Sequence, residues 1–278
     1  MTTASDWSGS IGDVWAAEWR RTDRIFAGLA TQLNAAILDM APSGSAAIVD
    51  IGCGAGTTSL AIAAALPGRQ VVGIDISPSL VEIATGRGQG LDNLSFRCGP
   101  AEEHLAGVAP VDLLVSRHGV MFFPDPVAAF SALRRGTVPG AGLVFSCFRA
   151  TALNPWATEL VVAAQGELPP PSTGYVPGPF AFADPDTVRA LLTAAGWSRI
   201  DCRPVEFSYR AGEGADPVAD ALNLFQRIGP VAPILRQAPA GERVAMLDRV
   251  EEVIARHHVD DAVDFPAAAW LWSAHNDG

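Results

Sequence analysis

Short apolar runs alternate with amphipathic segments through the first half of the chain. The apolar runs predict strands at residues 46–51, 71–75, 94–98, 111–116 and 142–148. Between them, apolar positions at helical spacing predict helices at residues 57–66, 78–87 and 126–135. Near-continuous apolar strands separated by helices are typical of a parallel sheet covered on both faces. This half of the chain therefore predicts an α/β fold built from repeated β-α units.

The pattern becomes less regular after residue 148. It predicts a helix that begins near residue 184 and stops at Gly196, a strand at 200–210 and a last strand at 262–273. Between these two strands, residues 216–258 carry apolar positions at helical intervals. We interpret that segment as helices inserted before the last strand, where they complete a cap or form a homodimer surface.

Composition narrows the choice of partners. The chain has 278 residues, of which 49% are hydrophobic and 18% charged, as expected of a packed globular protein. Its formal net charge of −11 disfavours nucleic acid and anionic membranes as partners, because both need a concentrated positive face. The first residues do not have the pattern of a signal peptide, and long uninterrupted apolar runs are lacking, so we expect a cytoplasmic location.

Three glycines and a carboxylate mark the junction of the first strand and the first helix, where residues 47–57 read AIVDIGCGAGT. Gly52, Gly54 and Gly56 let the main chain turn sharply and approach a ligand without interference from Cβ atoms. The third glycine comes one residue earlier than in the dinucleotide-binding fingerprint. Asp50 would also repel a pyrophosphate but attract an ammonium group. We expect Cys53 to fill space in this loop and to border the ligand, not to act as a nucleophile.

The second strand also ends in a carboxylate, Asp75, which lies 19 residues after Gly56. This spacing suits a carboxylate that accepts both hydroxyls of an adenosine ribose. A nucleoside with a cationic amino acid at its other end fits both acidic residues, and S-adenosylmethionine is such a ligand. The pair VDIGCGAG and VVGIDIS resembles the class I S-adenosylmethionine-dependent methyltransferases, especially the ubiquinone/menaquinone-biosynthesis branch with its many small-molecule enzymes. The resemblance is good over residues 46–149 and weaker over 180–210 and the last strand.

This resemblance implies a Rossmann-like, mostly parallel seven-stranded sheet with an antiparallel last strand. It implies an N-terminal helical lid at residues 1–45 and a methyltransferase domain at 46–278, with a cap insert at about 213–260. S-adenosylmethionine would be the cofactor and S-adenosylhomocysteine the product. The residues implied to bind it are Asp50, Gly52, Cys53, Gly54, Gly56 and Ser116 at the methionine end, Asp75 and Ile76 at ribose and adenine, and Ala101 and Glu102 at adenine. Relatives commonly carry Asp where this chain has Pro100, so the adenine would be held by the Ala101 N–H, by packing, or by Glu102.

Few side chains are needed for the transfer itself, because methyl transfer mainly requires alignment and exclusion of water. His118 is the candidate general base, with a pocket-wall role as the alternative. Candidate walls for the acceptor are Trp15, Trp19, Met121, Phe122, Tyr175 and Phe180. They predict a small, largely apolar acceptor, aromatic acceptors included, with methylation at oxygen favoured over carbon and nitrogen. We expect no metal site. The alternatives are an NAD-dependent oxidoreductase and a non-catalytic nucleoside-binding protein.

Overall fold

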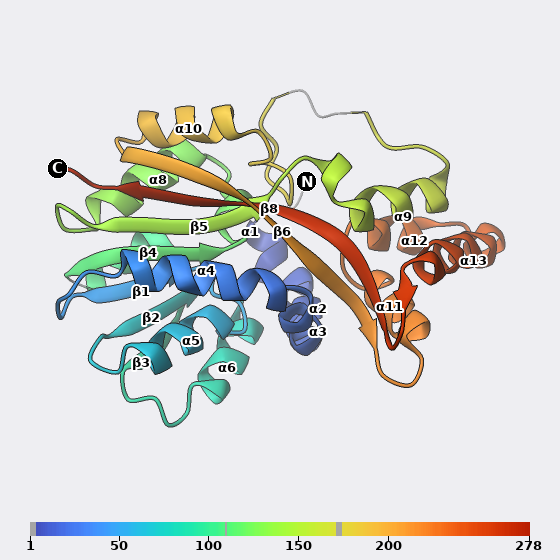
Figure 1. Cartoon of the computed structure of the whole chain (residues 1–278), viewed down its shortest axis with the longest axis horizontal. Helices are drawn as coiled ribbons and strands as arrows, with labels where there is room; N and C mark the ends of the chain where they lie inside the picture. Colours follow the sequence, from blue (N-terminus) through green and yellow to red (C-terminus); the bar gives the residue numbers. More distant parts are fainter. Residues whose placement is uncertain (1–3, 109, 171–173) are drawn as a thin grey trace.

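A single sheet forms the centre of the protein (Figure 1). The computed structural model describes residues 4–108, 110–170 and 174–278. The strands along the sheet run in the order β3-β2-β1-β4-β5-β8-β6. Their bounds are β1 Ala47–Ile51, β2 Val71–Asp75, β3 Leu94–Cys98, β4 Val111–Arg117, β5 Gly142–Phe148, β6 Ser198–Glu213 and β8 Ala262–His275.

The direction of the strands confirms the predicted Rossmann-like sheet. Strands β1 to β5 pair in parallel, and the central β1 lies between β2 and β4. Strand β8 pairs antiparallel with both β5 and β6, as expected for the last strand. The carboxyl ends of β1, β2 and β4 therefore meet at one edge, where ligands bind in folds of this kind.

The strand count needs a correction, since the described residues form eight strands and not seven. The additional strand is β7 (His258–Val259), which pairs with Val263 and Ala262 at the start of β8. Asp260, in the left-handed region at φ 54°, turns the chain back between β7 and β8. A two-residue strand created by such a tight turn has no apolar pattern of its own that a sequence could reveal.

Helices cover both faces of the sheet (Figure 1). On one face α4 (Ala27–Met40) packs against α5 (Thr57–Ala65), and on the other α8 (Pro126–Arg135) packs against α10 (Pro185–Ala194). Several helices begin with an acceptor side chain followed by proline, which suits the first turn because its missing N–H would have no partner there. Asp125 accepts a hydrogen bond from the Ala128 N–H at 3.0 Å, and Ser77 caps α6 (Pro78–Arg87) in the same way.

Two groups of helices extend beyond the carboxyl edge of the sheet. The N-terminal group comprises α1 (Ala4–Trp7), α2 (Ser10–Ala17) and α3 (Trp19–Ile25). The second group lies between β6 and β8 and comprises α11 (Pro217–Phe225), α12 (Val231–Gln237) and α13 (Ala240–Arg256), with α9 (Pro155–Gln165) packed against α12 and α13. Among the described residues, no helix is both long enough and apolar enough to span a membrane.

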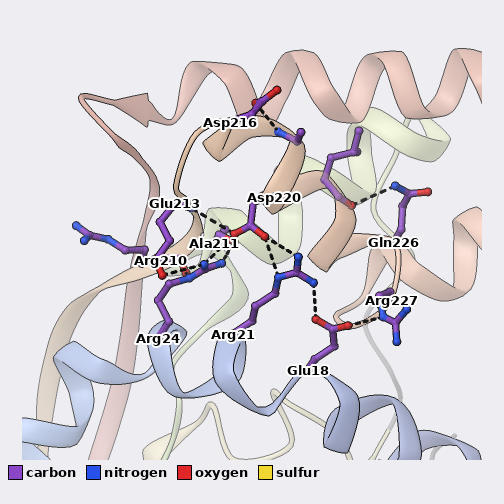
Figure 2. A network of polar contacts seen from close by, with 12 residues as sticks. Glu18, Arg21, Arg24, Arg210, Ala211, Glu213, Asp216, Asp220, Gln226 and Arg227 are labelled. Carbon is purple, nitrogen blue, oxygen red and sulfur yellow. Dashed lines mark hydrogen bonds and ion pairs between the residues drawn. The ribbon is translucent and has the colours of Figure 1, made fainter.

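Ion pairs fasten these two groups to each other (Figure 2). Asp220 of α11 accepts hydrogen bonds from the Arg21 guanidinium at 2.6 and 2.9 Å and pairs with Arg24 at 2.8 Å. The largely buried Glu18 bonds Arg21 at 2.6 Å and pairs with Arg227, in the loop after α11, at 2.5 Å. Charge-assisted bonds between partly buried groups are stronger than exposed ion pairs. These ion pairs with the insert therefore hold the N-terminal helices over the carboxyl edge of the sheet.

Burial along α4 gives a direct test of how the fold is stabilised. Leu33 is completely buried on this helix, whereas Leu38, five residues further on, is 39% exposed. We expect Leu33→Ala to lower the free energy of unfolding by about 2–5 kcal/mol, because it removes buried methyl groups and leaves a cavity. Leu38→Ala is the matched control, with an expected change within about 0.5 kcal/mol. Urea unfolding measures both, and equal losses would contradict the packing described for α4.

Candidate functional site

A cavity of about 330 Å³ lies at the carboxyl ends of β1, β2 and β4. Residues that follow these strands form its floor, and aromatic side chains of α2 and α3 form part of its roof. The predicted residues that line it are Asp50, Gly52, Cys53, Gly54, Asp75, Ile76, Ala101, Glu102, Trp15, Trp19, His118, Met121 and Phe122. Residues that are far apart in the sequence, from both the predicted cofactor site and the predicted acceptor wall, therefore share one space.

The bend between β1 and α5 forms the floor through close contact between main chains. Gly52 has φ 62°, and a Cβ atom on it would lie 2.9 Å from the Gly119 Cα. A side chain is therefore excluded on both steric and conformational grounds. At Gly54, with φ 55°, a Cβ would meet no atom within 4 Å. The space beside Gly54 is thus empty, so a ligand can approach the main chain of the loop there.

Asp50 lies at the end of β1 with only 1% of its surface exposed. Its Oδ2 accepts a hydrogen bond from the Ser59 hydroxyl at 2.6 Å, whereas the buried Oδ1 has no partner among the described residues. Burial raises the pKa of Asp50 from 3.8 to about 7, against the lowering effects of the Ser59 bond and of Arg117. A cationic ligand group would supply the missing partner and favour the charged carboxylate.

Asp75 holds the bend to the end of β2. Its Oδ2 accepts the Gly54 N–H at 2.8 Å and its Oδ1 accepts the Ser77 N–H at 2.9 Å. Burial raises the pKa of this carboxyl, and the main-chain bonds act in the opposite direction. Each carboxylate oxygen has a second lone pair, so both can still accept a hydroxyl from a ligand. The geometry fits a vicinal diol such as that of ribose.

His118 adopts a left-handed conformation, φ 61°, directly after β4. Its main-chain N–H donates to the Ser146 carbonyl at 3.1 Å, and its Nδ1 lies 2.9 Å from the Ser146 Oγ. Nε2 is buried without a partner among the described residues. Burial, followed by the positive charge of Arg117, lowers the pKa of His118 to about 3. The imidazole is therefore neutral at physiological pH, and a non-glycine residue held in this region is a feature that clusters at functional sites.

Aromatic rings continue the wall from His118 toward the insert. The His118 ring centroid lies 4.2 Å from Phe148, which lies 5.0 Å from Trp156. Trp156 in turn stacks on Tyr209 at 4.7 Å with an interplanar angle of 11°. All four residues line the cavity, together with Phe26 of the loop before α4. This side of the cavity suits a flat, apolar ligand.

Four predicted site residues, Gly56, Ser116, Tyr175 and Phe180, are not among the described residues that line the cavity, so their contact with a ligand stays a prediction. Ser116 turns its hydroxyl toward the Ile51 carbonyl at 2.7 Å, and Gly56 faces Phe96 at the start of α5. Tyr175 donates its hydroxyl to the Phe123 carbonyl at 2.7 Å, and Phe180 packs behind Trp156. These residues hold the wall from outside because their partners are main-chain or core atoms.

Several lining residues were not predicted from the sequence, among them Asp23, Arg117, Phe148, Trp156 and Tyr209. For Arg117 a usable signal existed, because it is the one basic residue of an otherwise largely apolar β4. Phe148 ends the predicted parallel strand β5, whose carboxyl end lies at the same edge of the sheet, so its position gave a signal as well. Asp23, Trp156 and Tyr209 come from α3, α9 and β6, and only the packing of these elements brings them to the cavity. The described residues include no group of three or more His, Cys, Asp or Glu side chains placed to hold a metal ion.

Comparison with known proteins agrees with this geometry. Residues 43–171 match a family described as "Methyltransferase domain". A trans-aconitate 2-methyltransferase of Methylobacterium radiotolerans is 28% identical over 74% of this chain and 76% of its own length. Another protein with that name, from Streptomyces avermitilis, is 31% identical over 37% of this chain and 39% of its own length. The family match over residues 43–171, together with the fold and the site, makes this chain an S-adenosylmethionine-dependent methyltransferase with the strand arrangement of class I enzymes.

Solved structures show the same fold at low sequence identity. Phosphoethanolamine N-methyltransferase 2 of Haemonchus contortus, solved with S-adenosyl-L-methionine, superposes with a TM-score of 0.52 at 14% identity and covers 100% of this chain and 61% of its own. A putative methyltransferase of Bacillus halodurans gives 0.51 at 14% identity and covers 89% and 100%. S-adenosylmethionine is the cofactor of this enzyme class, and the open glycine bend and the two acidic strand ends fit it.

The raised pKa of Asp50 leads to a prediction about stability and pH. In the unfolded chain Asp50 ionises near its ordinary pKa of 3.8, whereas in the folded chain it keeps its proton up to about pH 7. Between these values the folded state binds more protons, so the contribution of Asp50 to stability is lost as the pH rises. One pKa unit is worth about 1.4 kcal/mol. Asp50→Asn removes this titration, so its free energy of unfolding should decrease less between pH 5 and pH 8 than that of the wild type. The expected difference between the two decreases is about 2–3 kcal/mol.

Urea unfolding of the ligand-free protein at the two pH values measures this difference. Asp39→Asn on the exposed side of α4 is the control and should reproduce the wild-type pH dependence. Identical pH profiles for Asp50→Asn and the wild type would show that Asp50 titrates normally.

Proposed function

We propose that this enzyme methylates a small, largely apolar acceptor, with an oxygen atom as the favoured site. The observation that carries the proposal is the continuous aromatic wall that begins at His118, beside the glycine bend, and reaches Tyr209. It offers a flat acceptor an apolar surface in the same cavity as the acidic strand ends. Planar aromatic and conjugated acceptors would bury their faces against these rings.

The chain's own residues would hold the cofactor along the edge of the sheet. Asp75 would accept the ribose hydroxyls, with Ile76 beside the adenine. Ala101 is the first residue of α7 (Ala101–His104), so its N–H has no partner within that helix and can donate to the adenine ring, with Glu102 next to it. Asp50 and the main chain of residues 52–54 would surround the methionine end. When bound, the cofactor supplies an electrophilic methyl group on its sulfonium.

The remaining side chains align the acceptor and exclude water from the reaction. We propose that residues 1–45 act as a lid, because Trp15 and Trp19 line the cavity and Asp220 fixes α3, the helix of Trp19, to the insert. Residues 1–3 of that lid lie outside the described residues. His118 would accept the proton of an acceptor hydroxyl through Nε2, which its contact with Ser146 leaves for a ligand. The imidazole is unprotonated at any pH well above 3, so Nε2 is available as an acceptor. A pKa this low makes it a weak base, so the proton must come from a hydroxyl that is itself acidic, such as that of a phenol.

The relatives named trans-aconitate 2-methyltransferases support a small-molecule acceptor. Trans-aconitate itself fits this cavity poorly, because Arg117 can pair with only one of its three carboxylates, and the other two would face aromatic rings and the acidic side chains Asp23, Asp50 and Glu102. We therefore place the acceptor of this enzyme among less charged molecules. Methylation at an activated ring carbon is the second candidate, since it needs positioning against an aromatic wall more than it needs a base.

A turnover screen with methyl-labelled S-adenosylmethionine tests the proposal. The panel contains phenols, quinols, indoles, amines and trans-aconitate, and mass spectrometry of the products identifies the methylated atom. We expect turnover of phenols or quinols at oxygen. Exclusive methylation of amines or of trans-aconitate would contradict the proposed acceptor class. Titration of NAD and S-adenosylhomocysteine into the same protein tests the oxidoreductase alternative, which requires NAD to bind more tightly.

Replacement of Asp75 tests the position of the cofactor. We expect Asp75→Ala to weaken S-adenosylhomocysteine binding by about 1.5–3 kcal/mol, because charge-assisted hydrogen bonds to the ribose are lost. Isothermal titration calorimetry measures the affinity, and Asp248→Ala on the exposed side of α13 is the control. Thermal unfolding of both variants verifies the fold. Unchanged affinity in folded Asp75→Ala would remove this residue from the site.

Replacement of His118 tests its role in proton removal. For a hydroxylated acceptor, we expect His118→Ala to lower kcat by about 10²–10⁴, the usual contribution of a general base. Because the pKa of His118 is about 3, its titration should add no step to the kcat profile between pH 5 and 8. The exposed His258→Ala is the control. A loss of less than tenfold at saturating acceptor would reduce His118 to a residue of the pocket wall.

A further inference from the structure

Arg117, the last residue of β4, brings a guanidinium to the cavity wall. The side chain is 12% exposed, and its Nη1 is buried without a partner among the described residues. The Phe26 ring centroid lies 5.2 Å from its central carbon. Contact with a ring face does not satisfy the donors of the guanidinium, which lie in its own plane. A donor of this kind that remains unpaired in the interior costs free energy.

The neighbouring acidic groups do not supply the missing partner. Asp23 is the nearest carboxylate, but its Oδ1 is 3.5 Å from the Arg117 Nη2, and the same oxygen accepts the Thr57 hydroxyl. Its Oδ2 bonds Arg87 at 2.8 Å. One carboxylate is therefore shared by two guanidinium groups. The other acidic group near Arg117 is Asp50, whose pKa of about 7 leaves it partly protonated at neutral pH. Two guanidinium groups, Arg87 and Arg117, thus lie beside one carboxylate, Asp23, and the partly protonated Asp50.

We infer that Arg117 binds a carboxylate in this cavity, carried either by the methionine tail of the cofactor or by the acceptor. A guanidinium pairs with a carboxylate through two parallel hydrogen bonds. A single negative charge is favoured over a doubly charged phosphate, because Arg117 is the unpaired cation at this wall among the described residues and balances one charge only. Asp50 also has an unpartnered buried oxygen at the cavity. One unpaired acidic oxygen and one unpaired guanidinium nitrogen together match the ammonium and carboxylate of an amino acid.

This inference rests on the proposed function, and ligands that differ only in the carboxylate test it without turnover. Isothermal titration calorimetry compares S-adenosylhomocysteine with its decarboxylated analogue, which keeps the ammonium group. The comparison is made on the wild type, Arg117→Lys and Arg117→Met. Arg203→Met is the matched control, because Arg203 is exposed on β6 and bonds only Gln32 in the described part of the chain. Benzoate and trans-aconitate are titrated into each protein saturated with S-adenosylhomocysteine to examine the acceptor side.

If the carboxylate belongs to the cofactor, the wild type and Arg203→Met should bind S-adenosylhomocysteine at least 30-fold more tightly than the analogue. Arg117→Met should reduce that ratio to below threefold, and Arg117→Lys should retain part of it. If it belongs to the acceptor, the ratio stays unchanged in Arg117→Met, but binding of benzoate or trans-aconitate to the loaded protein weakens at least tenfold.

The inference is overturned if the wild type binds S-adenosylhomocysteine without preference for its carboxylate and neither acid depends on Arg117. The inference stays testable even if Arg117→Met fails to fold. A wild-type affinity ratio near one between S-adenosylhomocysteine and its decarboxylated analogue excludes the cofactor as the source of the carboxylate. Binding of benzoate and trans-aconitate to Arg117→Lys then decides whether the acceptor is the source. If no nucleoside binds to the folded wild type, the proposed function itself fails, and this inference with it.

Discussion

The close approach of two loops at Gly52 and Gly119 is the constraint on which the site depends. Strands β1 and β4 are neighbours, so the loops that follow their carboxyl ends begin very close to each other. A Cβ on Gly119 would lie 2.8 Å from the Ile51 carbonyl oxygen, and one on Gly52 only 2.9 Å from the Gly119 Cα. Because Gly52 and Gly119 have no side chains, the main chains of the two loops can pass each other in direct contact. Asp50, which precedes one loop, and Arg117 and His118, which precede Gly119, then line the same cavity.

Acidic residues and aromatic residues form separate parts of the cavity around this bend. The acidic residues Asp50 and Asp75 end neighbouring strands and have few partners apart from Ser59 and the main chain. The aromatic wall beyond His118 contains rings from α9 and β6 stacked on one another. The acidic strand ends and the aromatic wall thus offer charged and apolar contacts within one cavity, which suits a cationic nucleoside and the proposed apolar acceptor. The N-terminal helices add Trp15 and Trp19 to the lining of the same cavity.

The sequence predicted those parts of the molecule that depend on local pattern. Alternation of apolar runs located the parallel strands, and the glycine spacing with Asp50 and Asp75 located the bend and both acidic strand ends. The predicted insert indeed contains helices. The short β7 was missed, because it exists only through the turn at Asp260. Tyr175 and Phe180 were predicted to form the wall, yet Trp156 and Tyr209 form it instead, since the packing of helices on the sheet decides which aromatic ring reaches the cavity.

The most direct test of the central claim is a crystal structure of the protein with bound S-adenosylhomocysteine. The account predicts ribose hydroxyls within about 2.6–3.2 Å of the Asp75 carboxylate, which is ordinary hydrogen-bond distance. It also predicts the homocysteine end between the bend at residues 52–54 and Arg117. A nucleoside found outside this cavity, or bound in it with the ribose turned away from Asp75, would contradict the account.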